Sequence, residues 1–110
     1  MQWTIKRDKH VVICKVLGEL DHHNAKGMRD NIDIEIQKTD TNKLIFDFSA
    51  LEFMDSSGIG VLMGRYKLIN QLGGTVFVSG ARAHIKMVIT LSGLDKIVHM
   101  VSDIKSALNK

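Results

Sequence analysis

The chain reads Met-Asp-Ser-Ser-Gly-Ile-Gly over residues 54–60, between two segments of different hydrophobic periodicity. The preceding residues 44–48 are dense in apolar side chains, which predicts a central strand covered on both faces. After Asp55 the apolar residues recur every three or four positions as far as Leu72, which predicts an amphipathic helix. Asp55 is therefore expected to cap a helix that directly follows a buried strand.

The rest of the chain alternates in the same way between strand-like and helix-like patterns. The predicted strands cover residues 1–7, 11–17, 44–48, 75–78 and 97–100, and the predicted helices cover 22–38, 56–72, 82–91 and a terminal segment capped by Ser102. Asp21 is expected to cap the first helix, and Gly73-Gly74 to end the second. The resulting order, ββαβαβαβα, predicts an α/β fold with a mixed β-sheet and helices packed against it.

Three glycines, Gly58, Gly60 and Gly64, fall inside the predicted second helix. Each costs about 1 kcal/mol relative to alanine, so a close approach of other atoms is expected to explain them. We expect packing against the sheet at Gly64 and the approach of a partner at Gly58.

Length and composition predict one soluble domain over residues 1–110. A hydrophobic fraction of 45% is enough for a core in a chain of 110 residues. The single cysteine, Cys14, excludes an internal disulfide and lies in an apolar run, which favours burial. We recognise no signal peptide and no apolar run of the roughly 20 residues that cross a bilayer. A cytoplasmic protein without a membrane partner is expected.

Charge is unevenly divided between the two halves of the chain. Residues 1–55 carry eight Lys or Arg and ten Asp or Glu, a net charge of −2, whereas residues 56–110 carry seven and two, a net charge of +5. The basic residues of the second half, Arg65 among them, are interpreted as solvated sides of helices rather than as a face for a charged partner. One Trp, one Tyr and no cluster of basic residues argue against direct nucleic-acid binding.

The two serines after Asp55 have a setting suited to phosphorylation. The start of a helix has unpaired backbone N–H groups and the positive end of the helix dipole, so a serine there can carry a phosphate dianion. The string does not match the Gly-x-Ser-x-Gly motif of acyl-transfer nucleophiles, because Met54 and Asp55 stand where the first glycine is needed. Ser56 and Ser57 therefore indicate a switch rather than a catalytic nucleophile.

The string Asp21-His22-His23 leaves two further interpretations open. Histidines and an aspartate could ligate a metal, and a histidine at a helix N-terminus could carry a phosphoryl group. Adjacent helical residues point about 100° apart, however, so His22 and His23 are poorly placed to bind one ion. The phosphohistidine site lacks a neighbouring arginine, since Lys26 is the nearest basic residue in the sequence. Both interpretations are less favoured than solvated histidines in the first turn of a helix.

Several strings of the chain resemble STAS domains. They lie at residues 18–23, 54–62, 64–67, 71–74 and 92–94, and the likeness extends over essentially the whole chain. The resemblance is to the anti-sigma factor antagonists of endospore-forming bacteria, of the sporulation SpoIIAA type that acts on an anti-sigma-F factor. The chain departs from that family where the third predicted helix starts with Ala-Arg-Ala-His at residues 81–84, because relatives often have a proline there.

The resemblance implies a single STAS domain that is not an enzyme and uses neither a cofactor nor a metal. Family members bind an anti-sigma factor, a serine kinase with bound nucleotide, and this binding releases the sigma factor. The kinase phosphorylates the serine after the motif aspartate, here Ser56, which abolishes binding until a phosphoserine phosphatase removes the phosphate. Asp21 matches an aspartate that contacts a basic residue of the kinase. Asp55, Ser57 and Gly58 complete the partner-binding surface that the resemblance implies.

Two other functions remain open at this point. One is a general-stress antagonist of the same family, which the Asp21-His22-His23 string disfavours. The other belongs to a different class, a small metal-dependent phosphoesterase that would use Asp21, His22 and Asp55.

Overall fold

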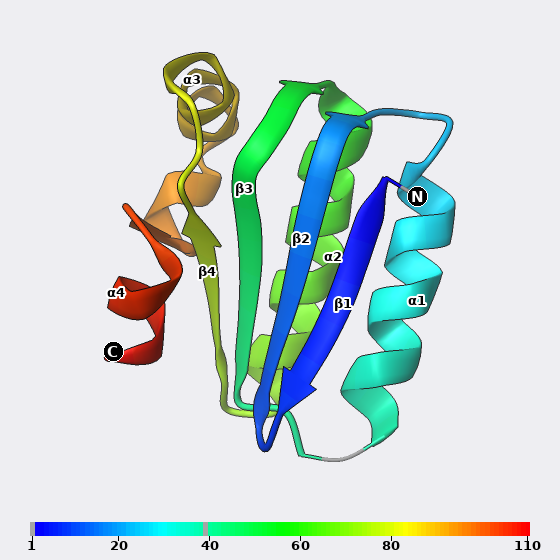
Figure 1. Ribbon diagram of the computed structural model, residues 1–110, viewed down its shortest axis with the longest axis vertical. Helices are drawn as coiled ribbons and strands as arrows, with labels where there is room; N and C mark the ends of the chain where they lie inside the picture. Colours follow the sequence, from blue (N-terminus) through cyan, green and yellow to red (C-terminus); the bar gives the residue numbers. More distant parts are fainter. Residues whose placement is uncertain (1, 39) are drawn as a thin grey trace.

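The structure of the protein, a computed structural model, describes residues 2–38 and 40–110. Over these residues, strands and helices alternate as Figure 1 shows. In chain order the elements are β1 (Trp3–Asp8), β2 (Val11–Leu20), α1 (Ala25–Lys38), β3 (Lys43–Met54), α2 (Ser56–Gln71), β4 (Thr75–Ser79), α3 (Ala83–Ser92), the 3₁₀ turn η1 (Leu94–Lys96), β5 (His99–Val101) and α4 (Ile104–Leu108). The order of strands and α-helices confirms the predicted ββαβαβαβα pattern.

The strands form one mixed sheet in the order β1-β2-β3-β4-β5. β1 pairs antiparallel with β2 across a tight turn, and the three other neighbouring pairs are parallel. Each parallel pair is joined by a crossover that contains a helix, as parallel pairing requires. β2 and β3 therefore end at the same edge of the sheet, at the top of Figure 1, where α2 begins.

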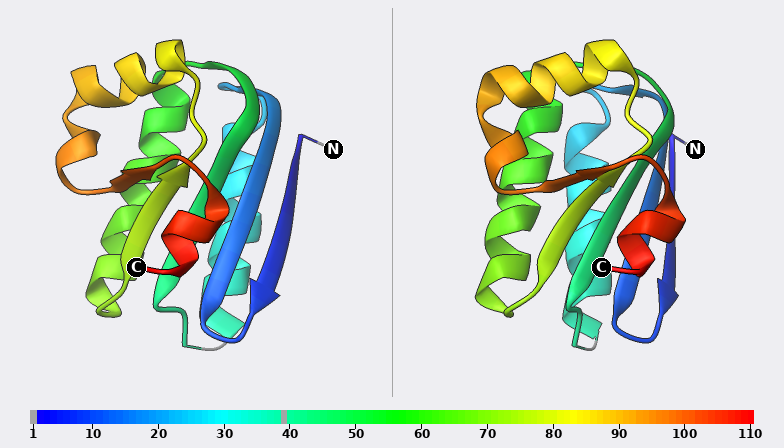
Figure 2. Two further views of the ribbon diagram at one scale, coloured as in Figure 1. Left: turned by 60° about the vertical axis from the view of Figure 1, so that its left-hand side comes forward. Right: turned by 90° about the vertical axis from the view of Figure 1, so that its left-hand side faces the viewer.

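The two faces of the sheet are covered to different extents. α1 and α2 run side by side along one face, with α3 near its upper end, whereas α4 lies on the opposite face (Figures 1 and 2). α4 covers only a small cluster in which Ile45, Phe77 and Ala107 are buried. The larger core therefore lies between the sheet and the first three helices.

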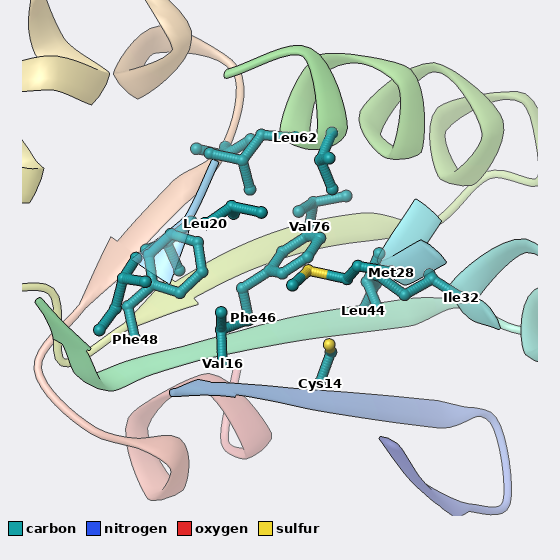
Figure 3. Close-up of a cluster of buried hydrophobic side chains, with 14 of the residues drawn as sticks. Cys14, Val16, Leu20, Met28, Ile32, Leu44, Phe46, Phe48, Leu62 and Val76 are labelled. Atoms are coloured by element: carbon teal, nitrogen blue, oxygen red, sulfur yellow. The ribbon is translucent and has the colours of Figure 1, made fainter. Parts of the chain in front are cut away.

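Apolar side chains from strands and helices meet in that larger core. Figure 3 shows Phe46 of β3 between the strands and the side chains of Met28 on α1 and Leu62 on α2. Cys14 of β2 lies at the bottom of the same cluster, and burial raises the pKa of its thiol to about 12. The expected burial of this cysteine is confirmed, and the raised pKa makes it a poor nucleophile at neutral pH.

β2 and β3 are longer than the sequence predicts. The string Gly-Glu-Leu at residues 18–20 is expected to break the second strand, but the strand continues to Leu20. Gly18 has a φ of +72°, and register shifts on either side of it keep the two strands paired. Irregularities of this kind absorb extra residues without ending a ladder. β3 pairs with β2 up to Met54 and so extends well beyond the predicted residues 44–48.

Other element boundaries also differ from prediction. The first helix begins at Ala25 rather than His22, and the last strand lies at His99–Val101 because η1 precedes it. Asp103, not Ser102, caps α4: its Oδ1 accepts a hydrogen bond from the N–H of Ser106 over 2.8 Å. This bond lowers the pKa of Asp103. The predicted start of the first strand at Met1 lies outside the described residues.

Arg65 is buried, which corrects its interpretation as a solvated residue. Its relative exposure is 6%, and its Nε lies 2.8 Å from Oδ1 of Asp33 on α1. The pair joins the middle of α2 to the middle of α1. Spacing along α2 could not reveal it, because the partner belongs to another helix.

Candidate functional site

Two loops meet where β2 and β3 end. Leu20, the last residue of β2, is paired with Met54, the last residue of β3. The N–H of Asp55 also donates a hydrogen bond to the carbonyl of Leu20 over 3.3 Å. Asp21 and Asp55 therefore follow paired residues at one edge of the sheet.

Asp55 caps α2 as the sequence predicts. Its backbone is extended, with φ −104° and ψ −169°, and its Oδ1 accepts a hydrogen bond from the N–H of Ser57 over 2.8 Å. Its carbonyl accepts another from the N–H of Gly58 over 3.0 Å. The cap fixes the first turn of α2, in which Ser56 is exposed and Ser57 is half-buried. Of the two serines, Ser56 is the more accessible to another protein.

Gly58 and Gly64 have settings opposite to those expected. Gly58 is buried, and a Cβ atom there would overlap the side chain of Met54 and lie 3.1 Å from Cγ of Leu20. Internal packing therefore accounts for this glycine, because a larger residue would push α2 away from the strands. At Gly64, no atom of the described residues lies within 4 Å of such a Cβ, apart from the two neighbouring residues and the backbone of α2 itself. The reasons that the sequence suggested for these two glycines are therefore wrong.

Asp21 closes the turn that precedes α1. Its Oδ1 accepts hydrogen bonds from the N–H groups of His23 (2.9 Å) and Asn24 (3.3 Å), and its own N–H donates to Oδ1 of Asn24 (3.0 Å). The predicted capping role is therefore real, but it serves a turn at residues 22–24 rather than the helix itself. About a fifth of the side chain is exposed, 20%, so Asp21 is also open to contact from outside.

A hollow of about 370 Å³ lies between the starts of α1 and α2. It is lined by Ser57, Gly60 and Val61 on α2, and by His22, Ala25, Lys26 and Arg29 on the other side. Lys26 Nζ lies 2.8 Å from Oδ2 of Asp30, and Arg29 Nε lies 3.7 Å from its Oδ1. The hydrogen bond from Lys26 and the nearby charge of Arg29 lower the pKa of Asp30. Ser57 of α2 thus has cationic neighbours.

These cationic neighbours were missed from the sequence. The net charge of −2 in the first half indicates acidic surroundings, but it averages over residues that the fold keeps apart. The available signal is the three-residue spacing of Lys26 and Arg29, which places them on one side of the predicted helix. Only the packing of α1 beside α2 brings that side against Ser57.

The histidines do not support the metal-dependent alternative. Within the described residues, no group of three or more His, Cys, Asp or Glu could hold a metal ion. His23 is strongly exposed, and its ring meets that of His22 edge-on, 6.0 Å away. His10 and His84 are turned to other parts of the fold, where their rings lie within hydrogen-bond distance of the carbonyls of Asp40 and Glu52.

The family model described as the STAS domain matches residues 2–107. The chain belongs to the STAS domain family. It is 36% identical over 110 residues to the anti-sigma F factor antagonist of Paenibacillus polymyxa. The alignment covers 100% of this chain and 94% of that relative. This match confirms the resemblance seen in the sequence.

Two solved structures have the same fold as this STAS domain. The anti-sigma factor antagonist SpoIIAA in its unphosphorylated form is 27% identical and matches with a TM-score of 0.88 over 97% of this chain and 93% of that one. The Bacillus cell fate determinant SpoIIAA in the phosphorylated form, also 27% identical, matches with a TM-score of 0.79 over 97% and 96%. None of the described helices of the present STAS domain is long and apolar enough to cross a membrane.

Proposed function

We propose that this STAS domain is a phosphorylation-regulated anti-sigma factor antagonist. Its unphosphorylated form binds an anti-sigma factor that is also a serine kinase, and this binding releases a sporulation sigma factor. Phosphorylation of Ser56 abolishes the binding. The observation that carries the proposal is an exposed serine directly after a helix-capping aspartate, in a chain similar to an anti-sigma F factor antagonist.

The reaction at Ser56 is a phosphoryl transfer from ATP held by the partner. The serine oxygen forms a bond to the γ-phosphorus, the bond from that phosphorus to the bridging oxygen breaks, and ADP and the hydroxyl proton leave. The STAS domain is the substrate of this reaction and not its catalyst. A phosphatase that hydrolyses the phosphoserine would return the domain to its binding form.

The geometry around Ser56 suits a switch that acts on binding rather than on folding. The side chain is exposed, so a phosphate there need not displace any buried group. At the interface with a kinase that still holds a nucleotide, the added charge of about −1.5 to −2 would face the nucleotide phosphates. Like charges brought together at an interface cost several kcal/mol. Phosphorylation should therefore dissociate the complex while the fold persists.

The proposed partner-binding surface comprises Asp21, Asp55, Ser56, Ser57 and Gly58. Asp21 would pair with a basic residue of the kinase, since its carboxylate lies at the same edge of the sheet as the serines. Gly58 is buried, so we assign it an indirect part: it lets α2 lie close to β2 and so places the serines.

The direct test is phosphorylation by the cognate anti-sigma factor with Mg-ATP, followed by intact mass and peptide mapping. We expect one phosphoryl group on the wild-type chain, one on the Ser57→Ala variant and none on Ser56→Ala. Because the two variants remove neighbouring hydroxyls from the same helical turn, each is the control for the other. A label that persists in Ser56→Ala and is lost in Ser57→Ala would refute the assignment.

A further inference from the structure

The hollow between the starts of α1 and α2 is lined by two cationic side chains that have no part in the proposed partner-binding surface. Lys26 and Arg29 border it from α1, and Ser57 and Gly60 border it from α2. Ser56 precedes Gly60 by four residues, so the two lie above one another on the same side of α2. Gly60 is exposed, and apart from its chain neighbours and the backbone of α2, no described atom lies within 4 Å of the place where its Cβ would be. Ser56 itself is not among the residues that line the hollow, but a phosphate on its side-chain oxygen would reach the hollow past Gly60, which has no side chain to block it.

We propose that phosphoserine at position 56 is captured by Lys26 and Arg29 of the same chain and so occupies this hollow. The capture rests on the proposed function, because that function is what places a phosphate on Ser56. The capture adds an intramolecular event to the proposed function, because phosphorylation then alters the surface of α1 as well as that of α2.

The two cations are free to change partners. Both contact only the carboxylate of Asp30 among the ion pairs of the described residues, and the side chain of Lys26 is 78% exposed. Exposed pairs of this kind contribute little to stability, so breaking them costs little. A phosphate offers a second negative charge and three strong acceptor oxygens, and it can bind arginine in a fork-like manner, whereas Oδ1 of Asp30 lies 3.7 Å from Nε of Arg29.

Capture has a consequence for the partner-binding surface. Before phosphorylation, the hollow presents the cationic groups of Lys26 and Arg29 beside Ser57. Afterwards the phosphate lies in the hollow, and part of its charge is offset by Lys26 and Arg29. The modified surface then differs from the unmodified one in shape and in the distribution of charge, in addition to the repulsion that the phosphate itself causes.

The test uses the full chain with phosphoserine incorporated genetically at position 56, so that no kinase is required. Thermal midpoints are measured with and without the phosphate in the wild type, in the double variant Lys26→Gln/Arg29→Gln and in Lys67→Gln. Lys67 is an exposed lysine of α2 that does not line the hollow, which makes its variant the matched control. Comparing each protein with its own phosphorylated form cancels any effect of the substitutions on the fold.

Phosphorylation should raise the midpoint by about 4 °C more in the wild type and in Lys67→Gln than in the double variant. High salt should remove most of this excess, because the contacts are solvent-exposed. The ³¹P resonance of phosphoserine should also move in the double variant and stay in place in Lys67→Gln. An equal thermal shift in all three proteins, or a ³¹P resonance that the double substitution leaves unchanged, would overturn the capture.

This outcome is independent of the test of the proposed function. If the kinase does not modify Ser56, the proposed function fails whatever the encoded phosphoserine does. If the kinase modifies Ser56 but the double substitution has no effect on the encoded form, only the capture fails.

Discussion

The contact between α1 and α2 has two regions in which charge is used differently. In its middle, Arg65 and Asp33 form a pair that is largely withdrawn from water, with side-chain exposures of 7% and 27%. At its upper end, Lys26 and Arg29 stand in solvent beside Ser57, around a hollow. One charged contact thus joins the two helices, whereas the cations at the upper end pair with Asp30 of α1 itself and remain in solvent.

The difference has a physical cause in the desolvation of the middle pair. Burial raises the pKa of Asp33 even though Arg65 is adjacent, and burial lowers the pKa of Arg65. Within the described residues, Nη1 of Arg65 is buried without a hydrogen-bond partner. A pair of this kind is costly to form and more costly to break. Substitutions there should change stability, and substitutions at the upper end should change binding.

The largest effect is expected from Asp33→Asn, which leaves the guanidinium of Arg65 buried without its counter-charge. Removing one partner of a buried pair costs about 3–5 kcal/mol, and the partial exposure of Asp33 reduces our expectation to about 2–3 kcal/mol. Urea denaturation measures the loss. Asp30→Asn, on the exposed side of the same helix, is the control and should change the midpoint little. If the two variants unfold at the same urea concentration, the contrast between the two regions is wrong.

The next effect concerns binding and is expected from Asp21→Asn. Asparagine caps a turn as well as aspartate does, so the variant removes charge and keeps the hydrogen bonds to His23 and Asn24. We expect about tenfold weaker binding of the anti-sigma factor at low salt, or about 1.4 kcal/mol, and a smaller difference at high salt. Isothermal titration at two salt concentrations would measure both. Wild-type affinity at both concentrations would show that Asp21 is only a cap.

A third charged contact, between α1 and β1, extends the comparison. Glu35 of α1 accepts a hydrogen bond from Nε of Arg7 on β1 over 2.9 Å, with side-chain exposures of 19% and 17%. The hydrogen bond from Arg7, and a second from Lys38, lower the pKa of Glu35. The stability from this contact is therefore fully present above the unfolded-state pKa and is lost as the pH falls through the lower folded-state pKa.

The pH dependence of Glu35→Gln tests that contact. At neutral pH the variant should be less stable than the wild type by about 0.5–1 kcal/mol. The stability difference should narrow once the pH falls below about 4.3, the ordinary pKa of a glutamate, because the unfolded wild-type chain is then protonated at Glu35 more readily than the folded one; it should vanish below the lower folded-state pKa. Chemical denaturation of both proteins at a series of pH values from neutral to acidic measures this stability difference. If the difference in the free energy of unfolding stays constant from neutral to acidic pH, the charge of Glu35 contributes nothing to the stability.

Local sequence patterns predicted the parts of the site that depend on neighbouring residues. The cap by Asp55 and the strand-to-helix order follow from residue types within a few positions of each other, and the structure confirms both. The contacts that were missed join distant segments. Arg65 meets Asp33, and Arg29 approaches Ser57, only because α1 and α2 pack together on the sheet.

The smallest effect on stability is expected from Ser56→Ala. The hydroxyl is exposed, so its loss should change the free energy of unfolding by less than about 0.5 kcal/mol. The variant should still bind the anti-sigma factor and should resist phosphorylation, which leaves a permanently active antagonist. Failure to bind would make the hydroxyl a contact required for affinity and would require a different account of the switch.

The central claim, that phosphate on Ser56 controls partner binding without unfolding the domain, is tested most directly by one comparison of affinities. The cognate anti-sigma factor, with nucleotide bound, is titrated with the unphosphorylated chain and with the chain carrying phosphoserine at position 56. We expect the phosphorylated form to bind at least about a hundredfold more weakly, or about 2.7 kcal/mol, while its circular dichroism spectrum stays that of the folded domain. Equal affinity of the two folded forms would contradict the account.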